Sequence, residues 1–129
     1  MGFQFRKHYT RDEARSLLPQ VRQWLKELQD SRDRMAQQDK RIAQMLTGGN
    51  DVGGDLVNQW LKTVVQTKGM LQRFAKHEIQ IKDLDRGLID FPAILGGREV
   101  FLCWEQDEED IEFWHDLDTG YAGRERLSE

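Results

Sequence analysis

The spacing of apolar residues changes at Gly87, and this change constrains the fold more than any other feature of the sequence. Before Gly87, apolar residues recur at steps of three, four or seven, as they do on one face of a helix. One such stripe runs through Val21, Leu28, Met35 and Ile42. After Gly87, apolar and polar residues alternate, which is typical of strands with one buried face. The sequence therefore predicts an α+β fold, in which a long antiparallel helical hairpin precedes a small three-stranded antiparallel β-meander.

The hairpin is predicted to consist of helices at residues 10–47 and 55–86. Residues 48–54 between them are rich in glycine and other turn formers, and Gly87 is expected to end the second helix. The first helix has an apolar stripe that is interrupted by Arg32 and Asp39, and its remaining positions are charged residues or glutamine. The second helix has apolar residues at steps of three, four or seven. Two such helices joined by a short loop should pair with each other in antiparallel orientation.

The start of the first helix has its own signals. Thr10 and Glu13 have the spacing of a capping box, in which each side chain binds the backbone N–H of the other residue. Pro19 is expected to kink this helix, or to lie in the first turn of a helix that begins afresh. Residues 3–9, ahead of the cap, are expected to form a short strand or an ordered lead-in.

The meander is predicted over residues 88–116 and is followed by a C-terminal tail at residues 117–129. Gly96 and Gly97 mark a tight turn between its first two strands, and the polar residues 106–109 mark the second turn. The tail is expected to be a loop that can fold back over the sheet.

The two turns predict a strand register in which Leu95 pairs with Arg98 and Glu105 pairs with Asp110. This register places one apolar set on a single face of the sheet: Ile89, Phe91, Ala93, Val100, Leu102, Trp104, Ile111 and Phe113. We expect that face to lie on a helix, with His115 at its edge.

The opposite face of the predicted sheet combines polar and aromatic side chains. One row across the strands holds Asp90, Cys103 and Glu112, and the next row holds Pro92, Phe101 and Trp114. An aromatic patch beside a polar row is unusual for a face that only meets water. In this register, Cys103 and His115 lie on opposite faces of the sheet.

Length and charge limit the classes of protein to consider. A chain of 129 residues is expected to be one domain. Its 19 basic and 23 acidic residues give a net charge of −4, which disfavours binding to nucleic acid. The chain has no apolar run of the roughly 20 residues that span a bilayer and no apolar segment typical of a signal peptide. With a single cysteine, the expected location is the reducing cytoplasm.

Several short motifs occur in a fixed order over nearly the whole chain: Leu17-Leu18-Pro19, Gly87-Leu-Ile-Asp-Phe-Pro92, Gly97-Arg98, Leu102-Cys-Trp104, Trp114-His115 and Gly120…Gly123-Arg124. In these motifs the chain resembles the bacterial family known as domain of unknown function 2203. The pair Glu108-Glu109 departs from the Gly-Glu of that family, in the turn before the third strand. The resemblance implies no activity, substrate or cofactor. It implies that the family motif includes Asp90, Arg98, Cys103, Trp104, His115 and Arg124.

A metal site is one interpretation of the polar residues on the meander. The candidate ligands are Asp90, Cys103, Glu108, Glu112 and His115. These residue types bind zinc or iron, so a divalent metal such as zinc is the expected cofactor of such a site. The spacing matches no paired Cys/His motif, and the predicted register separates Cys103 from His115.

A structural interpretation competes with the metal site. Cys103 can pack as a small apolar side chain, and His115 can form a hydrogen bond at the edge of the core with Asp83 or Asp85. A cysteine hydrolase is disfavoured, because a reactive thiol needs an electropositive setting and Asp90 is predicted to lie beside this one.

Two arginines also have alternative interpretations. Arg98 and Arg124 can together bind an anion, because the guanidinium group matches carboxylate and phosphate groups. They can also form salt bridges with Glu99, Asp116 or Asp118, and this interpretation is favoured over the anion site.

The leading functional hypothesis is a binding or interaction module for an unidentified protein or small molecule. Three short strands can cover only part of two long helices, so the end of the hairpin near Met45 and Val57 would be exposed in a monomer. Pairing two hairpins into a four-helix bundle would cover it, and a homodimer is therefore expected. The alternative is a metal-dependent enzyme whose site on the meander uses His115, Glu108 and Asp90, with Cys103 as a further ligand.

Overall fold

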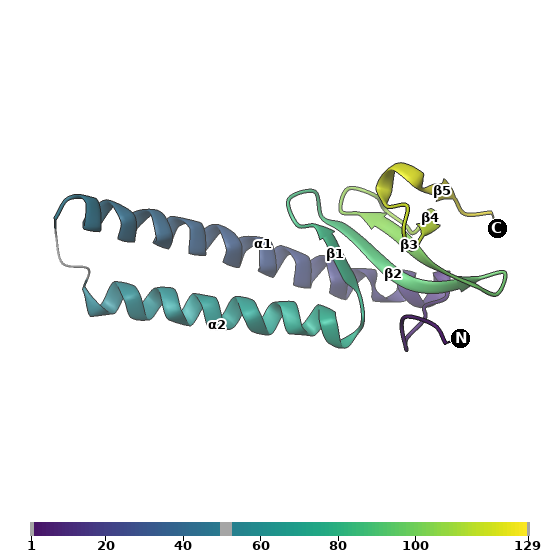
Figure 1. Ribbon diagram of the computed structural model, residues 1–129, viewed down its shortest axis with the longest axis horizontal. Helices are drawn as coiled ribbons and strands as arrows, with labels where there is room; N and C mark the ends of the chain where they lie inside the picture. The colour runs from purple at the N-terminus through teal and green to yellow at the C-terminus, as the bar shows by residue number, and fades with distance from the viewer. Residues whose placement is uncertain (1, 50–52, 129) are drawn as a thin grey trace. The chain divides into compact units, whose positions relative to one another are not determined.

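The computed structural model describes residues 2–49 and 53–128; residue 1, part of the predicted loop at 50–52 and residue 129 lie outside the described residues. Its elements are α1 (Arg11–Thr47), α2 (Gly54–Lys76), β1 (Gln80–Asp83), β2 (Leu88–Leu95), β3 (Arg98–Glu105), β4 (Phe113–Asp116), the 3₁₀ helix η1 (Tyr121–Gly123) and β5 (Glu125–Arg126) (Figure 1). Two helices followed by an antiparallel sheet confirm the predicted fold class. The prediction of three strands is wrong, since the described residues form a five-stranded sheet in the order β1-β2-β3-β4-β5.

The start of α1 agrees with the predicted capping box. The backbone N–H of Glu13 donates to Thr10 Oγ1 over 3.1 Å, and the N–H of Thr10 donates to Glu13 Oε1 over 2.9 Å. The helix then continues through Pro19, so the prediction of a fresh start at this residue is wrong. Pro19 is exposed, and water can therefore bind the carbonyl group that loses its helical hydrogen bond there. Residues 3–9 form an ordered lead-in and no strand.

The second helix ends ten residues earlier than predicted, at Lys76 instead of residue 86. Glu78 has a positive φ of 56°, which turns the chain into β1. Ile81 fits the helical spacing, but its neighbours Gln80 and Lys82 are polar, so the same residues also fit a strand. Pairing with β2 decides between the two, because β1 satisfies backbone groups that β2 would otherwise leave unpaired at its edge.

Two compact units divide the chain, and each has its own packing. One unit comprises residues 1–25 and 74–129, and the other comprises residues 26–73. In the first unit, the buried side of α1 up to Leu25 provides Ala14, Leu18, Val21 and Leu25. To the same core, the sheet provides Ile89, Phe91, Ala93, Val100, Leu102 and Trp104, and the loop before β4 provides Ile111. The guanidinium of Arg22 on α1 lies over the Trp104 ring, 5.0 Å from its centroid, so the apolar face of the sheet packs on a helix as predicted.

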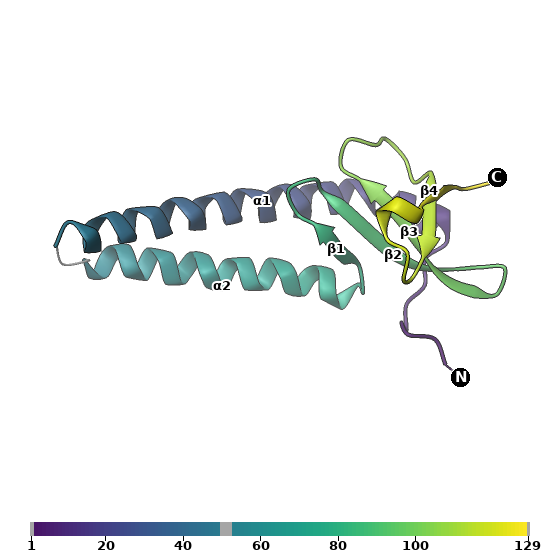
Figure 2. The same ribbon diagram turned by 45° about the horizontal axis from the view of Figure 1, so that its top comes forward.

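The second unit is a pair of helical segments that lie side by side in both views (Figures 1 and 2). Polar pairs join them: Ser31 Oγ lies 2.6 Å from Thr67 Oγ1, and the indole N–H of Trp60 donates to Asp39 over 2.6 Å. Over the described residues, no helix is both long and apolar enough to cross a membrane.

The register of β2 against β3 is the predicted one, with Leu95 opposite Arg98 and Asp90 opposite Cys103. The register of β3 against β4 is one residue away from the prediction. Cys103 lies opposite Phe113 and not Glu112, and Phe101 lies opposite His115. A shift of one residue moves every side chain of a strand to the other face. His115 and Phe113 therefore lie on the same face as Cys103, and the placement of Phe113 in the apolar set is wrong.

A wide loop explains the shift in register. The predicted turn at 106–109 is in fact a connection over residues 106–112. Arg22 on α1 donates to the carbonyl groups of Gln106, Glu108 and Glu109, and the indole N–H of Trp104 donates to the carbonyl of Glu108 over 2.9 Å. These contacts hold the loop open, so that β4 begins only at Phe113.

Replacing Gly87 with alanine is expected to lower the free energy of unfolding by about 2–4 kcal/mol. Gly87 has a φ of 67° in the turn between β1 and β2, and an added Cβ would lie 2.4 Å from the Cβ of Gln106. Gly96→Ala is the matched control, since Gly96 also has a positive φ (58°) but has open space around it, and about 1–2 kcal/mol is expected. Denaturant unfolding measures the stability of both variants. Equal losses would show that the contact of the added Cβ with Gln106 has no cost.

Candidate functional site

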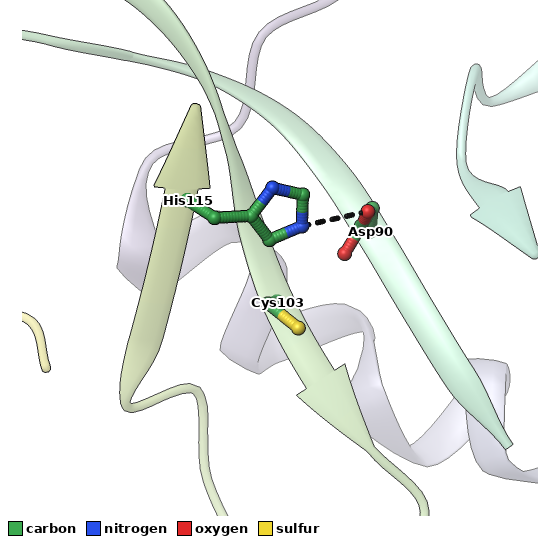
Figure 3. Close-up of side chains that lie close together, drawn as sticks. All are labelled: Asp90, Cys103 and His115. Carbon is green, nitrogen blue, oxygen red and sulfur yellow. Dashed lines mark hydrogen bonds and ion pairs between the residues drawn. The ribbon is translucent and has the colours of Figure 1, made fainter. Parts of the chain in front are cut away.

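Three side chains converge on the sheet face that points away from α1. They are Asp90 on β2, Cys103 on β3 and His115 on β4, and Figure 3 shows them pointing toward one another. One ligand atom from each residue lies within 4.8 Å of the others. All three are buried, with exposed fractions of 1%, 0% and 2%. We call this set the Asp–Cys–His cluster.

Both ring nitrogens of His115 have partners. Nδ1 lies 2.7 Å from the carbonyl oxygen of Asp116. Nε2 lies 2.9 Å from Oδ2 of Asp90 (Figure 3). A carbonyl group only accepts hydrogen bonds, so Nδ1 carries a hydrogen. Nε2 then either donates to an ionised Asp90 or accepts from a protonated one. In both cases, one proton is shared between the two side chains.

The surroundings of His115 change its pKa in two directions. Burial by itself would lower the pKa. Hydrogen bonds to Asp90, Cys103 and the Asp116 carbonyl, together with the charge of Asp90, outweigh burial and raise the pKa of His115 from 6.5 to about 10. Without a metal, the cluster therefore keeps its proton at neutral pH.

The stability of the metal-free protein is expected to fall as the pH rises from about 6.5 to 9. His115 binds its proton more tightly in the folded chain, so its contribution is complete below about pH 6.5 and is lost as the pH approaches 10. Chemical unfolding with a chelator present, at several pH values, measures this. Staying below pH 9 avoids Tyr9, whose pKa is raised to about 12 by burial and by the charge of Glu78. The decrease of the unfolding free energy with pH should be smaller in the double variant Asp90→Asn, His115→Gln. An unchanged pH dependence would show that His115 does not cause it.

Arg124 covers the sulfur side of the cluster. Its Nη1 donates to Cys103 Sγ over 3.8 Å, and its Nη2 lies 2.7 Å from Oε2 of Glu108. Its guanidinium also lies over the rings of Phe113 and Tyr121, at 3.8 and 4.3 Å from their centroids. The tail thus folds back over the sheet. The prediction that the tail is a loop is wrong, since it contains η1 and pairs with β4 through β5.

The geometry does not suit a cysteine nucleophile. In a Cys–His–Asp arrangement, one ring nitrogen faces the thiol and the other faces the carboxylate. Here Nε2 of His115 faces Asp90, and Nδ1 is bound to a backbone carbonyl.

The structure brings some of the candidate residues together and separates the others. Trp104 lies on the opposite face of the sheet and supports the loop that holds Glu108. Arg98 forms a salt bridge of 3.1 Å with Asp116, so it does not form an anion site together with Arg124. Glu112 lies outside the cluster, and its carboxylate lies 3.7 Å from Nη1 of Arg126.

The partner of His115 differs from the predicted one. The sequence pointed to Asp83 or Asp85, but Asp83 accepts the backbone N–H of Arg86, and His115 binds Asp90. Asp116, whose backbone carbonyl fixes the orientation of the imidazole ring, was not foreseen. A carbonyl group is present at every residue, so the sequence has no signal for this contact.

Comparison with known proteins assigns the chain to a family. The family described as "Uncharacterized conserved protein (DUF2203)" matches residues 7–127. The chain belongs to the DUF2203 family. No curated protein and no solved structure matches it. The match confirms the resemblance seen in the sequence, and it spans the whole Asp–Cys–His cluster together with Arg124.

In this DUF2203 protein, the cluster has the features of a metal site. It offers one nitrogen, one oxygen and one sulfur ligand atom, all of which zinc accepts. Histidines that bind metals usually donate the other ring N–H to a carbonyl or carboxylate group, as His115 does to Asp116. Oδ1 of Asp90 is buried and has no hydrogen-bond partner among the described residues. An unpaired buried acceptor is unfavourable, and a cation would satisfy it.

Proposed function

We propose that this protein binds a divalent metal ion of the zinc type through Asp90, Cys103 and His115. The observation that carries the proposal is the convergence of three different buried ligand atoms within 4.8 Å. Charge supports a divalent ion, because an ionised aspartate and a thiolate together balance two positive charges. The sulfur ligand favours zinc, cobalt or cadmium over magnesium or manganese. A thiolate ligand must stay reduced, which fits a reducing compartment such as the cytoplasm.

Titration with Co²⁺ tests the proposal directly. Protein purified without chelator, then stripped of metal, is titrated while its absorption spectrum is recorded. A thiolate-to-cobalt charge-transfer band at one equivalent is expected. Since Cys103 is the only cysteine in the sequence, that band has a single source. Zn²⁺ should displace the cobalt and abolish the band.

Two variants make the cobalt result specific. His115→Ala should lose the band, whereas Glu112→Gln should keep it, because Glu112 is a nearby carboxylate outside the cluster. Wild-type protein that takes up no cobalt, zinc or iron would refute the proposal. His115 would then have the structural role of a buried partner of Asp90.

A second function, homodimerisation through the helical hairpin, is supported by apolar side chains on the unit at residues 26–73. Four of them are between 47% and 69% exposed: Leu46, Leu61, Val65 and Leu71. Leu61 and Val65 are one turn apart on α2 and form a continuous apolar surface. A second copy of the chain would cover this surface by forming a four-helix bundle, which would make the protein an interaction module.

Sedimentation at micromolar concentration tests the dimer. The wild-type protein is expected to have twice the mass of one chain, and the double variant Leu61→Lys, Val65→Glu is expected to be monomeric. The control Lys62→Glu alters a neighbouring charge without changing the apolar surface. A monomeric wild-type protein would refute this second function and leave the metal proposal unaffected.

A further inference from the structure

The number of protein ligands in the Asp–Cys–His cluster leaves one coordination position unassigned. Zinc sites are almost always four-coordinate, and structural sites take all four ligands from the protein. Among the described residues, the cluster supplies three. The fourth ligand must therefore come from another side chain, such as Glu108, whose partner Arg124 also contacts Cys103, or from outside the chain.

The carboxylate of Glu108 is fully engaged elsewhere. Its Oε1 accepts the backbone N–H of Glu105 over 2.8 Å, and its Oε2 lies 2.7 Å from Nη2 of Arg124. The backbone of Glu108 is fixed as well, because its carbonyl accepts hydrogen bonds from Trp104 and Arg22. A hydrogen-bonded carboxylate paired with arginine in this way is a poor candidate for a metal ligand.

Arg124 occupies the space between Glu108 and the sulfur of Cys103. It contacts both, and its side chain is only 14% exposed, so the pair is held in a largely buried setting. The rings of Phe113 and Tyr121 fix the guanidinium plane from the sides. The arginine is therefore a rigid spacer between the carboxylate and the cluster.

Resting on the proposed metal binding, we propose that the Arg124–Glu108 pair keeps the fourth coordination position open for water or a small exchangeable ligand. Arg124 holds the Glu108 carboxylate away from the metal, so that the centre has three protein ligands. Three protein ligands and one exchangeable position are the arrangement of catalytic zinc sites. Arg124 acts here as a positioning residue, since it touches a ligand and not the metal.

The test uses Co²⁺-loaded protein with thiocyanate as the exchangeable probe. In the wild-type protein, thiocyanate should shift the visible cobalt bands. Glu108→Gln should respond like the wild type, because Glu108 is not a ligand. In Arg124→Gln the freed Glu108 can bind the cobalt, and at least a tenfold weaker thiocyanate response is expected. The double variant Arg124→Gln, Glu108→Gln should regain the response.

The double variant separates the proposal from a simpler effect of charge. If Arg124 merely attracted the anion, the double variant would stay unresponsive, and this outcome would overturn the proposal. A wild-type protein that binds Co²⁺ but ignores thiocyanate, with a response appearing only in Glu108→Gln, would also overturn it, because Glu108 would then be the fourth ligand. Failure of the wild-type protein to bind Co²⁺ would instead refute the metal site itself.

Discussion

Replacing Asp90 with alanine is expected to lower the free energy of unfolding of the metal-free protein by about 3–5 kcal/mol at neutral pH. Both members of the Asp90–His115 pair are buried, and their 2.9 Å contact satisfies the imidazole Nε2. Without the carboxylate, the imidazole must either stay charged and unpaired in the core or give up its proton. Denaturant unfolding with a chelator present measures the loss.

A double-mutant cycle assigns this loss to the pair. His115→Ala should also be strongly destabilising, because it leaves Asp90 without its partner. The variant with both substitutions is expected to be less destabilised than the sum, by about 0.5–3 kcal/mol. Exposed Asp12→Ala is a control that should change stability by no more than about 0.5 kcal/mol. Additive losses would mean that the two side chains act independently.

Replacing Cys103 with serine is expected to weaken zinc binding by at least about a thousandfold, which corresponds to about 4 kcal/mol. Serine keeps the size of the side chain but replaces a soft sulfur ligand with a hard, neutral hydroxyl group. Manganese depends less on sulfur, so its affinity should change by about tenfold or less. Competition titrations with a chromogenic chelator measure both affinities.

The change in zinc affinity relative to the change in manganese affinity shows whether Cys103 is a metal ligand or only a packing residue. If Cys103 only packs in the core, serine will weaken zinc and manganese binding to the same extent, through general destabilisation. Cys103→Ala is a useful companion, since it removes the ligand without introducing a buried hydroxyl group. It should weaken zinc binding at least as much as serine does.

Much of the fold could be predicted because local signals decide it. The change of period near Gly87 predicts a sheet after the helices, although the sheet begins earlier, with β1, and the capping box sets the start of α1. Gly96 and Gly97 both have positive φ values, 58° and 78°, and the two-residue turn they form fixes the register of β2 against β3. Each of these features depends on residues close together in the chain.

The wrong predictions concern features of the fold that are determined by contacts between residues far apart in the chain. The loop after β3 is held open by Arg22, which lies about 85 positions earlier in the chain, and no local pattern reveals this. The predicted register, which differs from the observed one by one residue, concealed the Asp–Cys–His cluster because it placed His115 on the wrong face of the sheet. The ligand residues could be chosen from their chemistry alone. Whether they meet depended on the length of one loop.

The one-residue shift between β3 and β4 also has a consequence for how the sheet assembles. In the slipped pairing, Asp90 would stay on its face while His115 moved to the other side, and the core would hold two polar groups without partners. The contact between these two side chains thus favours the observed pairing over the slipped one, in addition to the preference of the apolar side chains for the core face. The Asp90–His115 pair thus contributes to the specificity of the strand register as well as to the site.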